Sequence, residues 1–174
     1  MKKTIFFIII FFINNIVNAS TNVAYLDVQY IIDNSNLGKF YRSEIEKIQT
    51  KNNSIIILKE NEIKKKEDEF KNQKNLLNQD EIKKKIDEIN SMVKQYQILR
   101  NDFNKKLSNE KKKFSKEILL LLNPLLTKYV ESKNINLVIE KKNVLVGVKS
   151  LDITKNILEI FNEKTKNIKN SNAN

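Results

Sequence analysis

The side chains of this chain that could do chemistry are almost all carboxylates and amines. The 174 residues include 32 Lys and Arg and 21 Asp and Glu, with no Cys and no His. This composition excludes zinc held by thiolates or imidazoles, thiol nucleophiles and a Ser-His-Asp triad. Only Gly38 and Gly147 are glycines, so a glycine-rich phosphate-binding loop cannot be built. An enzyme is therefore the least favoured class, and no cofactor or metal is expected.

The carboxylates and amines recur at a spacing of four residues, which places both charges of a pair on one helix face. The pairs are Glu60/Lys64, Glu62/Lys66, Glu67/Lys71 and Asp102/Lys106. They predict long solvated helices rather than a catalytic site.

Large and apolar residues repeat in alternating steps of 4 and 3 between Ile82 and Leu121, which predicts the seam of a supercoiled helix. The positions are Ile82, Ile86, Ile89, Val93, Tyr96, Arg100, Phe103, Leu107, Glu110, Phe114, Glu117 and Leu121. A weaker run from Ile48 to Leu77 precedes it, with a stutter at Ile63. Polar residues interrupt both runs, which predicts arms that bend and splay. These are Asn52, Lys59, Lys66, Gln73, Arg100, Glu110 and Glu117.

The connection between the two runs is the polar tripeptide Asn78-Gln79-Asp80, and we expect Asp80 to cap the second helix. Because so short a connection forces long helices to lie antiparallel, residues 37–122 are predicted to form a helical-hairpin arm. Pro124 should kink the returning helix without ending it.

The segments on either side of the arm, residues 20–36 and 123–162, predict a small β base. Val23–Val28 is a buried-strand pattern, while 135–140 and 144–148 predict a β-hairpin. A last helix capped by Asp152 follows, and residues 163–174 are expected to be disordered. The fold class is thus α+β, mostly α. A base of some 52 residues buries too little surface alone, which favours self-association.

Residues 1–19 have the pattern of a secretory signal peptide, with Lys2 and Lys3 before an apolar run and a small residue at its end. Cleavage is expected between Ala19 and Ser20. The remaining chain would carry 30 basic and 21 acidic residues, a formal charge of +9. Such a surplus suits acidic partners such as anionic lipid head groups or polypeptides. Nucleic acid also suits the charge but conflicts with export.

The order of elements resembles that of the Skp/OmpH family of periplasmic chaperones. The resemblance is carried by Val23–Gln29, Ser35–Lys39, Asn136–Ile139, Asn143–Val146 and Asp152–Thr154. It implies a periplasmic homotrimer whose bases share a β-barrel and whose arms surround a cavity. Unfolded outer-membrane proteins would be held there without ATP. It also implies contact with lipopolysaccharide, for which no motif is matched, and Pro124 departs from the pattern.

An ATP-independent holdase chaperone is therefore the favoured function. The alternative is a structural coiled-coil spacer or envelope-linking protein, for which the arm is only a strut. If the arm holds clients, Ile57 is expected to point away from the partner helix and, helped by Ile56, to contact them. An isolated exposed Ile without a role is the simpler interpretation of the same residue.

Overall fold

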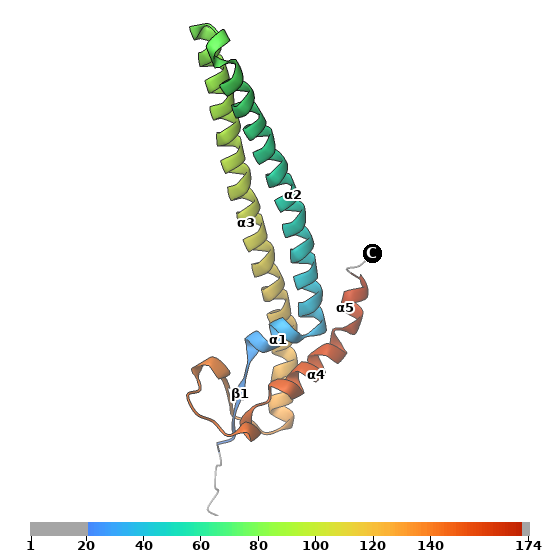
Figure 1. Cartoon of the computed structure of the whole chain (residues 1–174). Coiled ribbons are helices and arrows are strands. Elements are labelled where there is room, and N and C mark those ends of the chain that lie inside the picture. The colour runs from blue at the N-terminus through green and yellow to red at the C-terminus, as the bar shows by residue number, and fades with distance from the viewer. Residues whose placement is uncertain (1–20, 172–174) are drawn as a thin grey trace, which may run out of the picture.

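The computed structural model describes residues 21–171, and within them a long two-helix arm rises from a small base (Figure 1). Ala19 and the rest of the expected signal peptide, together with Ser20, lie outside the described residues. Among the described residues, no helix combines the length and the apolar character needed to cross a membrane.

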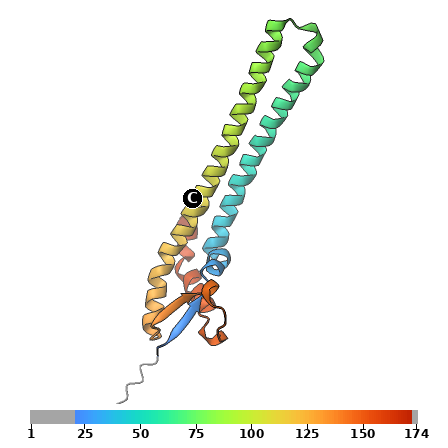
Figure 2. The ribbon, with the colours of Figure 1, turned by 90° about the vertical axis from the view of Figure 1, so that its left-hand side faces the viewer.

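The arm consists of α2 (Asn36–Gln73) and α3 (Gln79–Ser132), which run antiparallel side by side, as both ribbon views show (Figures 1 and 2). The 38 residues of α2 correspond to about 57 Å at the helical rise. A single 3-10 turn, η1 (Lys74–Leu76), begins the connection at the tip. The predicted antiparallel hairpin is therefore present, although α2 begins slightly before residue 37 and α3 extends well beyond 122.

The cap at the tip is Asn78, so the prediction of Asp80 was wrong. The Asn78 side chain accepts a hydrogen bond from the Glu81 backbone at 3.0 Å, and the Glu81 carboxylate accepts one from the Asn78 backbone at 2.9 Å. This reciprocal capping box needs a carboxylate or amide three residues after the cap. The residue three positions after Asp80 is Lys83, which cannot accept such a bond. Asp80 lies instead in the first turn of α3.

The base contains a two-stranded parallel sheet in which β1 (Val23–Leu26) pairs with β2 (Leu137–Glu140). The register runs from Val23 opposite Leu137 to Leu26 opposite Glu140. Asn22 fixes the start of the pairing, because its backbone donates to the Asn136 side chain at 2.9 Å.

The predicted β-hairpin of 135–140 and 144–148 is wrong, since the second of these segments forms no strand. Two 3-10 turns, η2 (Lys141–Asn143) and η3 (Lys149–Leu151), bracket it. The edge of β1 away from β2 is partly occupied by the chain at Asp152, where the Ile153 backbone donates to the Tyr25 carbonyl at 3.1 Å. Segment 144–148 thus has no strand partner among residues 21–171.

The chain turns sharply between α1 (Val28–Asn34) and α2. Ser35 is fully buried there and its hydroxyl accepts from the Gly38 backbone at 3.0 Å. A Cβ on Gly38 would fall on the carbonyl oxygen of Ile32, so only glycine lets α2 start this close to α1.

The core is shared by the base and the lower turns of the arm. It draws on β1, α1, α2, α3 and α4 (Thr154–Lys164). Its buried members are Ala24, Leu26, Ile31, Leu37, Tyr41, Ile118, Leu122, Ile153, Ile157 and Phe161. Because α2 and α3 contribute their lower ends to this core, the arm is anchored by packing and not by the sheet alone.

The last helices differ from expectation in two places. The N-cap of α4 is Ile153, while Asp152 acts one residue earlier by accepting from the Thr154 backbone at 3.0 Å. The tail predicted to be disordered continues instead as α5 (Lys166–Ser171), whose Ile168 packs against the core. As predicted, α3 passes through Pro124 without ending.

Candidate functional site

The described residues offer no constellation for catalysis. Within residues 21–171, no group of three acidic side chains lies close enough to hold a metal ion. None of the four predicted i,i+4 ion pairs forms in this part of the chain. Glu62 pairs with Lys59 at 2.7 Å, and Lys66 reaches across the arm to Glu88 at 3.2 Å. The surface of the arm is therefore considered as the candidate site.

The root of the arm is clamped by an aromatic pair. Tyr41 of α2 stacks on Phe114 of α3 with ring centroids 4.2 Å apart and planes within 1°. Its hydroxyl donates to the Glu117 carboxylate at 2.6 Å. Burial raises the pKa of Tyr41 far above its usual range, and the Glu117 carboxylate adds to the rise. The phenol thus stays protonated and remains a donor, which fixes the two helices relative to each other where they leave the base.

Higher up, the seam is well packed at some levels and open at others. Ile63 is only 9% exposed, but Lys59 lies on the surface and Asn52 is half-buried. Arg100 is exposed and lies over the Tyr96 ring, with its guanidinium carbon 5.6 Å from the ring centroid. These polar positions are the ones at which the sequence predicted a weakened coil.

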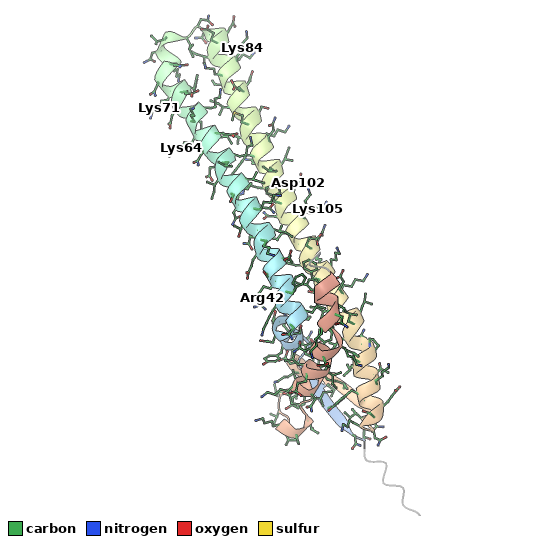
Figure 3. All side chains as sticks on the ribbon, turned by 90° about the vertical axis from the view of Figure 1, so that its right-hand side faces the viewer. Arg42, Lys64, Lys71, Lys84, Asp102 and Lys105 are labelled. Atoms are coloured by element: carbon green, nitrogen blue, oxygen red, sulfur yellow. The ribbon has the colours of Figure 1, made fainter. Side chains whose placement is uncertain are left out.

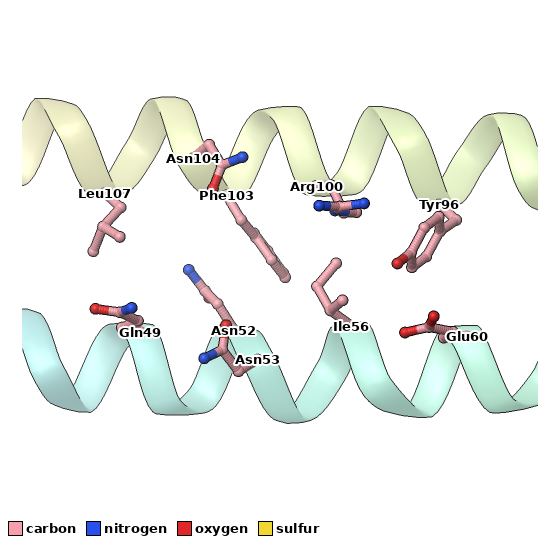
Figure 4. A pocket seen from close by; sticks show the side chains of 10 residues that line it. All are labelled: Gln49, Asn52, Asn53, Ile56, Glu60, Tyr96, Arg100, Phe103, Asn104 and Leu107. Atoms are coloured by element: carbon pink, nitrogen blue, oxygen red, sulfur yellow. The ribbon is translucent and has the colours of Figure 1, made fainter.

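At the level of these polar positions a groove of about 390 Å³ opens between α2 and α3 (Figure 4). We call it the mid-arm groove. Its residues are Gln49, Asn52, Asn53, Ile56 and Glu60 of α2, with Tyr96, Arg100, Phe103, Asn104 and Leu107 of α3. Ile56, Tyr96, Phe103 and Leu107 are half-buried and form an apolar floor, whereas the polar residues other than Asn52 are exposed.

The structure separates the two predicted client-contact residues. Ile57 is 57% exposed and lies outside the groove, as the sequence predicted for its direction. Ile56 is half-buried and lines the mid-arm groove beside the facing helix (Figure 4). Leu58, the next residue, is 62% exposed. An exposed apolar surface at this level therefore comprises Ile57 and Leu58, and Ile56 belongs to a different feature.

Charged side chains project along the whole arm (Figure 3). Lys64 and Lys71 of α2 and Lys84 and Lys105 of α3 are exposed, and none of them makes an ion pair within the described part of the chain. Because the lysines are not neutralised by neighbours, the arm carries a positive field into solvent.

The base has its own exposed apolar segment at 144–148. Leu145 is 99% exposed, Val146 90% and Val148 63%. Exposure of three large apolar side chains within four positions of the chain is unfavourable, and an exposed patch of this kind usually marks an interaction surface.

An ion pair closes the loop that carries this segment. Lys141 Nζ lies 2.9 Å from the Asp152 carboxylate. Its hydrogen bond to Asp152 raises the pKa of Lys141. Partial burial by itself would raise the pKa of Asp152, but the hydrogen bonds from Thr154 and Lys141 outweigh it and lower that pKa. The ion pair therefore favours the charged forms of both the Lys141 and the Asp152 side chains.

Sequence reasoning named most residues of the groove for other reasons, but it did not predict the groove and missed three of its carboxamides. Asn52 and Arg100 stood out only as polar interruptions of the heptad pattern, and Gln49, Asn53 and Asn104 lie outside that pattern. Carboxamides beside a seam gave no signal because the pattern registers only apolar spacing.

Comparisons with known proteins agree with this architecture. The family model described as "Outer membrane protein (OmpH-like)" matches residues 22–161. A crystal structure from Caulobacter crescentus CB15, of a candidate outer membrane chaperone (OmpH-like), superposes with a TM-score of 0.75 at 13% identity. The superposition covers 84% of this chain and 86% of that one. Comparison with proteins of curated annotation found no match.

The fold is thus that of a helical arm on a small β base, as in the Caulobacter protein. Because the family model spans most of the chain, this chain belongs to the OmpH-like family.

Proposed function

We propose that this chain is an ATP-independent holdase chaperone of the periplasm that binds unfolded outer-membrane proteins between basic helical arms and prevents their aggregation. Membership of the OmpH-like family supports the proposal, as does the fold shared with a candidate outer membrane chaperone. The observation that carries it is the arm itself, which presents unneutralised lysines and exposed apolar residues without any catalytic constellation.

The arm can hold an unfolded chain by passive binding. Unpaired lysines attract acidic segments at long range, and weak apolar contacts then retain them. A protein that binds only the unfolded state shifts that state away from aggregation by mass action, so no chemical step and no nucleotide are needed. The open levels of the seam allow the two helices to adjust to different clients.

A cavity requires more than one arm, and we propose a homotrimer whose bases together form a β-barrel. The exposed segment 144–148 supports this proposal because it is rich in β-branched residues and has no strand partner in the part of the chain that the structure describes. Pairing it with a neighbouring copy would bury Leu145 and Val146, which are almost fully exposed in one copy.

The proposed site of action is the periplasm, reached through a signal peptide cleaved between Ala19 and Ser20. Lipopolysaccharide or an anionic membrane surface is a further proposed partner, because the same lysines would contact phosphate groups. Nucleic acid is not a proposed partner, since the export pattern separates the chain from it.

The test is dilution of a urea-unfolded outer-membrane β-barrel protein into buffer with and without the mature chain, in the absence of ATP, with light scattering as the readout. We expect scattering to be suppressed. We also expect the association rate to fall as salt rises past about 0.15 M, because exposed charges are then screened within about 8 Å. Unchanged scattering would favour a structural coiled-coil spacer, and salt-independent capture would assign retention to apolar contacts.

A further inference from the structure

We propose that the mid-arm groove binds an extended segment of unfolded polypeptide through hydrogen bonds to its backbone. The inference deepens the proposed function and rests on it, because an unfolded client supplies such segments. It assigns the groove a ligand class, the peptide backbone, that does not depend on the client's sequence.

The rim of the groove carries unpaired carboxamides. Gln49, Asn52 and Asn53 of α2 and Asn104 of α3 make no side-chain hydrogen bond within the described part of the chain. A carboxamide has two donor hydrogens and an acceptor oxygen, and a peptide group has one donor and one acceptor. The two groups are therefore complementary in either chain direction. Asn52 is half-buried, so satisfying it gains more than satisfying a fully solvated amide.

The floor of the groove between the two helices is apolar. Ile56, Phe103 and Leu107 point into the space between α2 and α3 and remain half-exposed (Figure 4). In an extended segment, alternate side chains point to opposite sides. One set can cover this floor while backbone groups reach the carboxamides at the rim. Binding would then bury apolar surface that the seam leaves open.

The length of the groove fits a short extended segment. The α2 side of the groove extends from Gln49 to Glu60, which is about 16 Å at the helical rise. An extended chain rises about 3.3 Å per residue, so about five residues fit. This is long enough for several backbone hydrogen bonds and short enough to be found in any unfolded protein.

The charge of the groove is balanced. Arg100 and Glu60 bring one positive and one negative charge to it, so it has no net charge of its own. Of the exposed lysines, Lys64, Lys71 and Lys84 lie closer to the tip, and Lys105 lies at the level of the groove without lining it. Attraction and backbone recognition are thus separate properties of the same arm, and the groove has no reason to select acidic side chains.

The test uses the mature chain and two end-blocked, uncharged ten-residue peptides of alternating Val and Ser. The second peptide carries N-methyl groups on alternate residues, which removes backbone donors but keeps the side chains. We expect the unmodified peptide to bind at least about tenfold more tightly by fluorescence anisotropy. Equal affinities would overturn the proposal.

The groove variant is Asn52→Ala with Asn104→Ala, and its matched control is Asn61→Ala with Asn101→Ala, two exposed positions that do not line the groove. All four changes favour helix, so both variants should fold. We expect the groove variant to lose about tenfold in affinity for the unmodified peptide, the control to lose nothing, and Asn52→Gln with Asn104→Gln to retain binding. A groove variant that binds like the parent would overturn the proposal.

The aggregation assay separates this inference from the proposed function. If the parent suppresses aggregation but the groove variant keeps its peptide affinity, the groove proposal fails and the chaperone proposal stands. If the parent discriminates between the peptides but does not suppress aggregation, the reverse holds. A changed sedimentation mass of the groove variant would show a contact between copies and would also overturn the groove proposal.

Discussion

Ile57 and Ile63 lie six residues apart on α2, but only one of them is covered. Ile57 is 57% exposed and Ile63 is 9% exposed. The stutter predicted at Ile63 did not remove it from the seam, because the facing α3 side chains close over it. The direction of each side chain therefore follows from the helical period, while the degree of burial depends on the partner helix.

We predict that Ile57→Lys leaves helicity unchanged and the free energy of unfolding within about 0.5 kcal/mol of the parent, because the side chain is already solvated. Retention of an unfolded outer-membrane protein should weaken by about 1 kcal/mol per arm through lost apolar burial. Circular dichroism and client release rates measure the two effects.

The matched control is Ile63→Ala, which should lower the free energy of unfolding by about 2 kcal/mol because it opens the seam. If Ile57→Lys also melts the arm, Ile57 contributes to packing. If it leaves client release unchanged, Ile57 is only surface.

Asp152 links stability to pH through its lowered pKa. A carboxyl group whose pKa is lower in the folded state stabilises the fold above its unfolded pKa, about 3.8, and loses that effect as pH falls through the folded value. The raised pKa of Lys141 has the opposite sign, so its contribution is present below about 10.5 and is lost above that pH. The ion pair should therefore act across the whole range between these limits.

We predict that Asp152→Asn lowers the melting temperature at pH 7 and that the difference from the parent shrinks as pH falls below 3.8. Thermal melts across this pH range measure it. Asp33→Asn is the control, because Asp33 pairs with Arg42 at a more exposed place and should have a smaller effect. A difference that persists unchanged at pH 2 would contradict the assigned role of the carboxylate.

At the scale of elements, the tip of the arm depends on a reciprocal cap. We predict that Asn78→Ala lowers the stability of the tip by about 1 kcal/mol, because the Glu81 backbone loses its acceptor. Amide hydrogen exchange in the first turn of α3 should speed up. Asn75 in the adjacent 3-10 turn makes no side-chain hydrogen bond within the described residues, so Asn75→Ala should have little effect. Equal exchange in both variants would show that the cap adds nothing.

The sequence predicted the arm well because a heptad pattern can be read within one continuous segment of the chain. Tyr96, Phe103 and Leu107 all lie half-buried between the helices, as their spacing required. The base was harder to predict, because a run of β-branched residues indicates only that a segment can form a strand and not which strand it pairs with. Whether Leu137–Glu140 pairs with 144–148 or with β1 is decided by residues that are 114 positions apart.

The site was predicted only in part, for a similar reason. The outward direction of Ile57 follows from 100° per residue, but the mid-arm groove depends on how far apart α2 and α3 lie at that level. The helical tail was missed because Ile168 gains its partners from the core and not from its neighbours in the chain.

The proposed trimer depends on the exposed segment 144–148. We predict that Leu145→Asp with Val146→Asp leaves the secondary structure of one copy intact, since these side chains are 99% and 90% exposed. The sedimentation mass should fall from trimer toward monomer, because carboxylates would be buried between copies at high cost. Lys64→Asp with Lys105→Asp on the arm is the control and should keep the parental mass. If the variant Leu145→Asp with Val146→Asp remained trimeric, the contact between copies would lie outside segment 144–148.

The parallel pairing of β1 with β2 has a consequence for how the chain folds. β1 emerges from the ribosome early, but its partner strand follows only after the entire arm has been synthesised. Closing a disordered loop of this length would be slow, because loop-closure entropy rises with the number of free residues. Once α2 and α3 associate, however, the two ends of the arm lie next to each other. The conformational search that pairs β1 with β2 is then short. Formation of the arm therefore also promotes folding of the base. Any change that slows the association of α2 with α3 should slow the formation of the base as well.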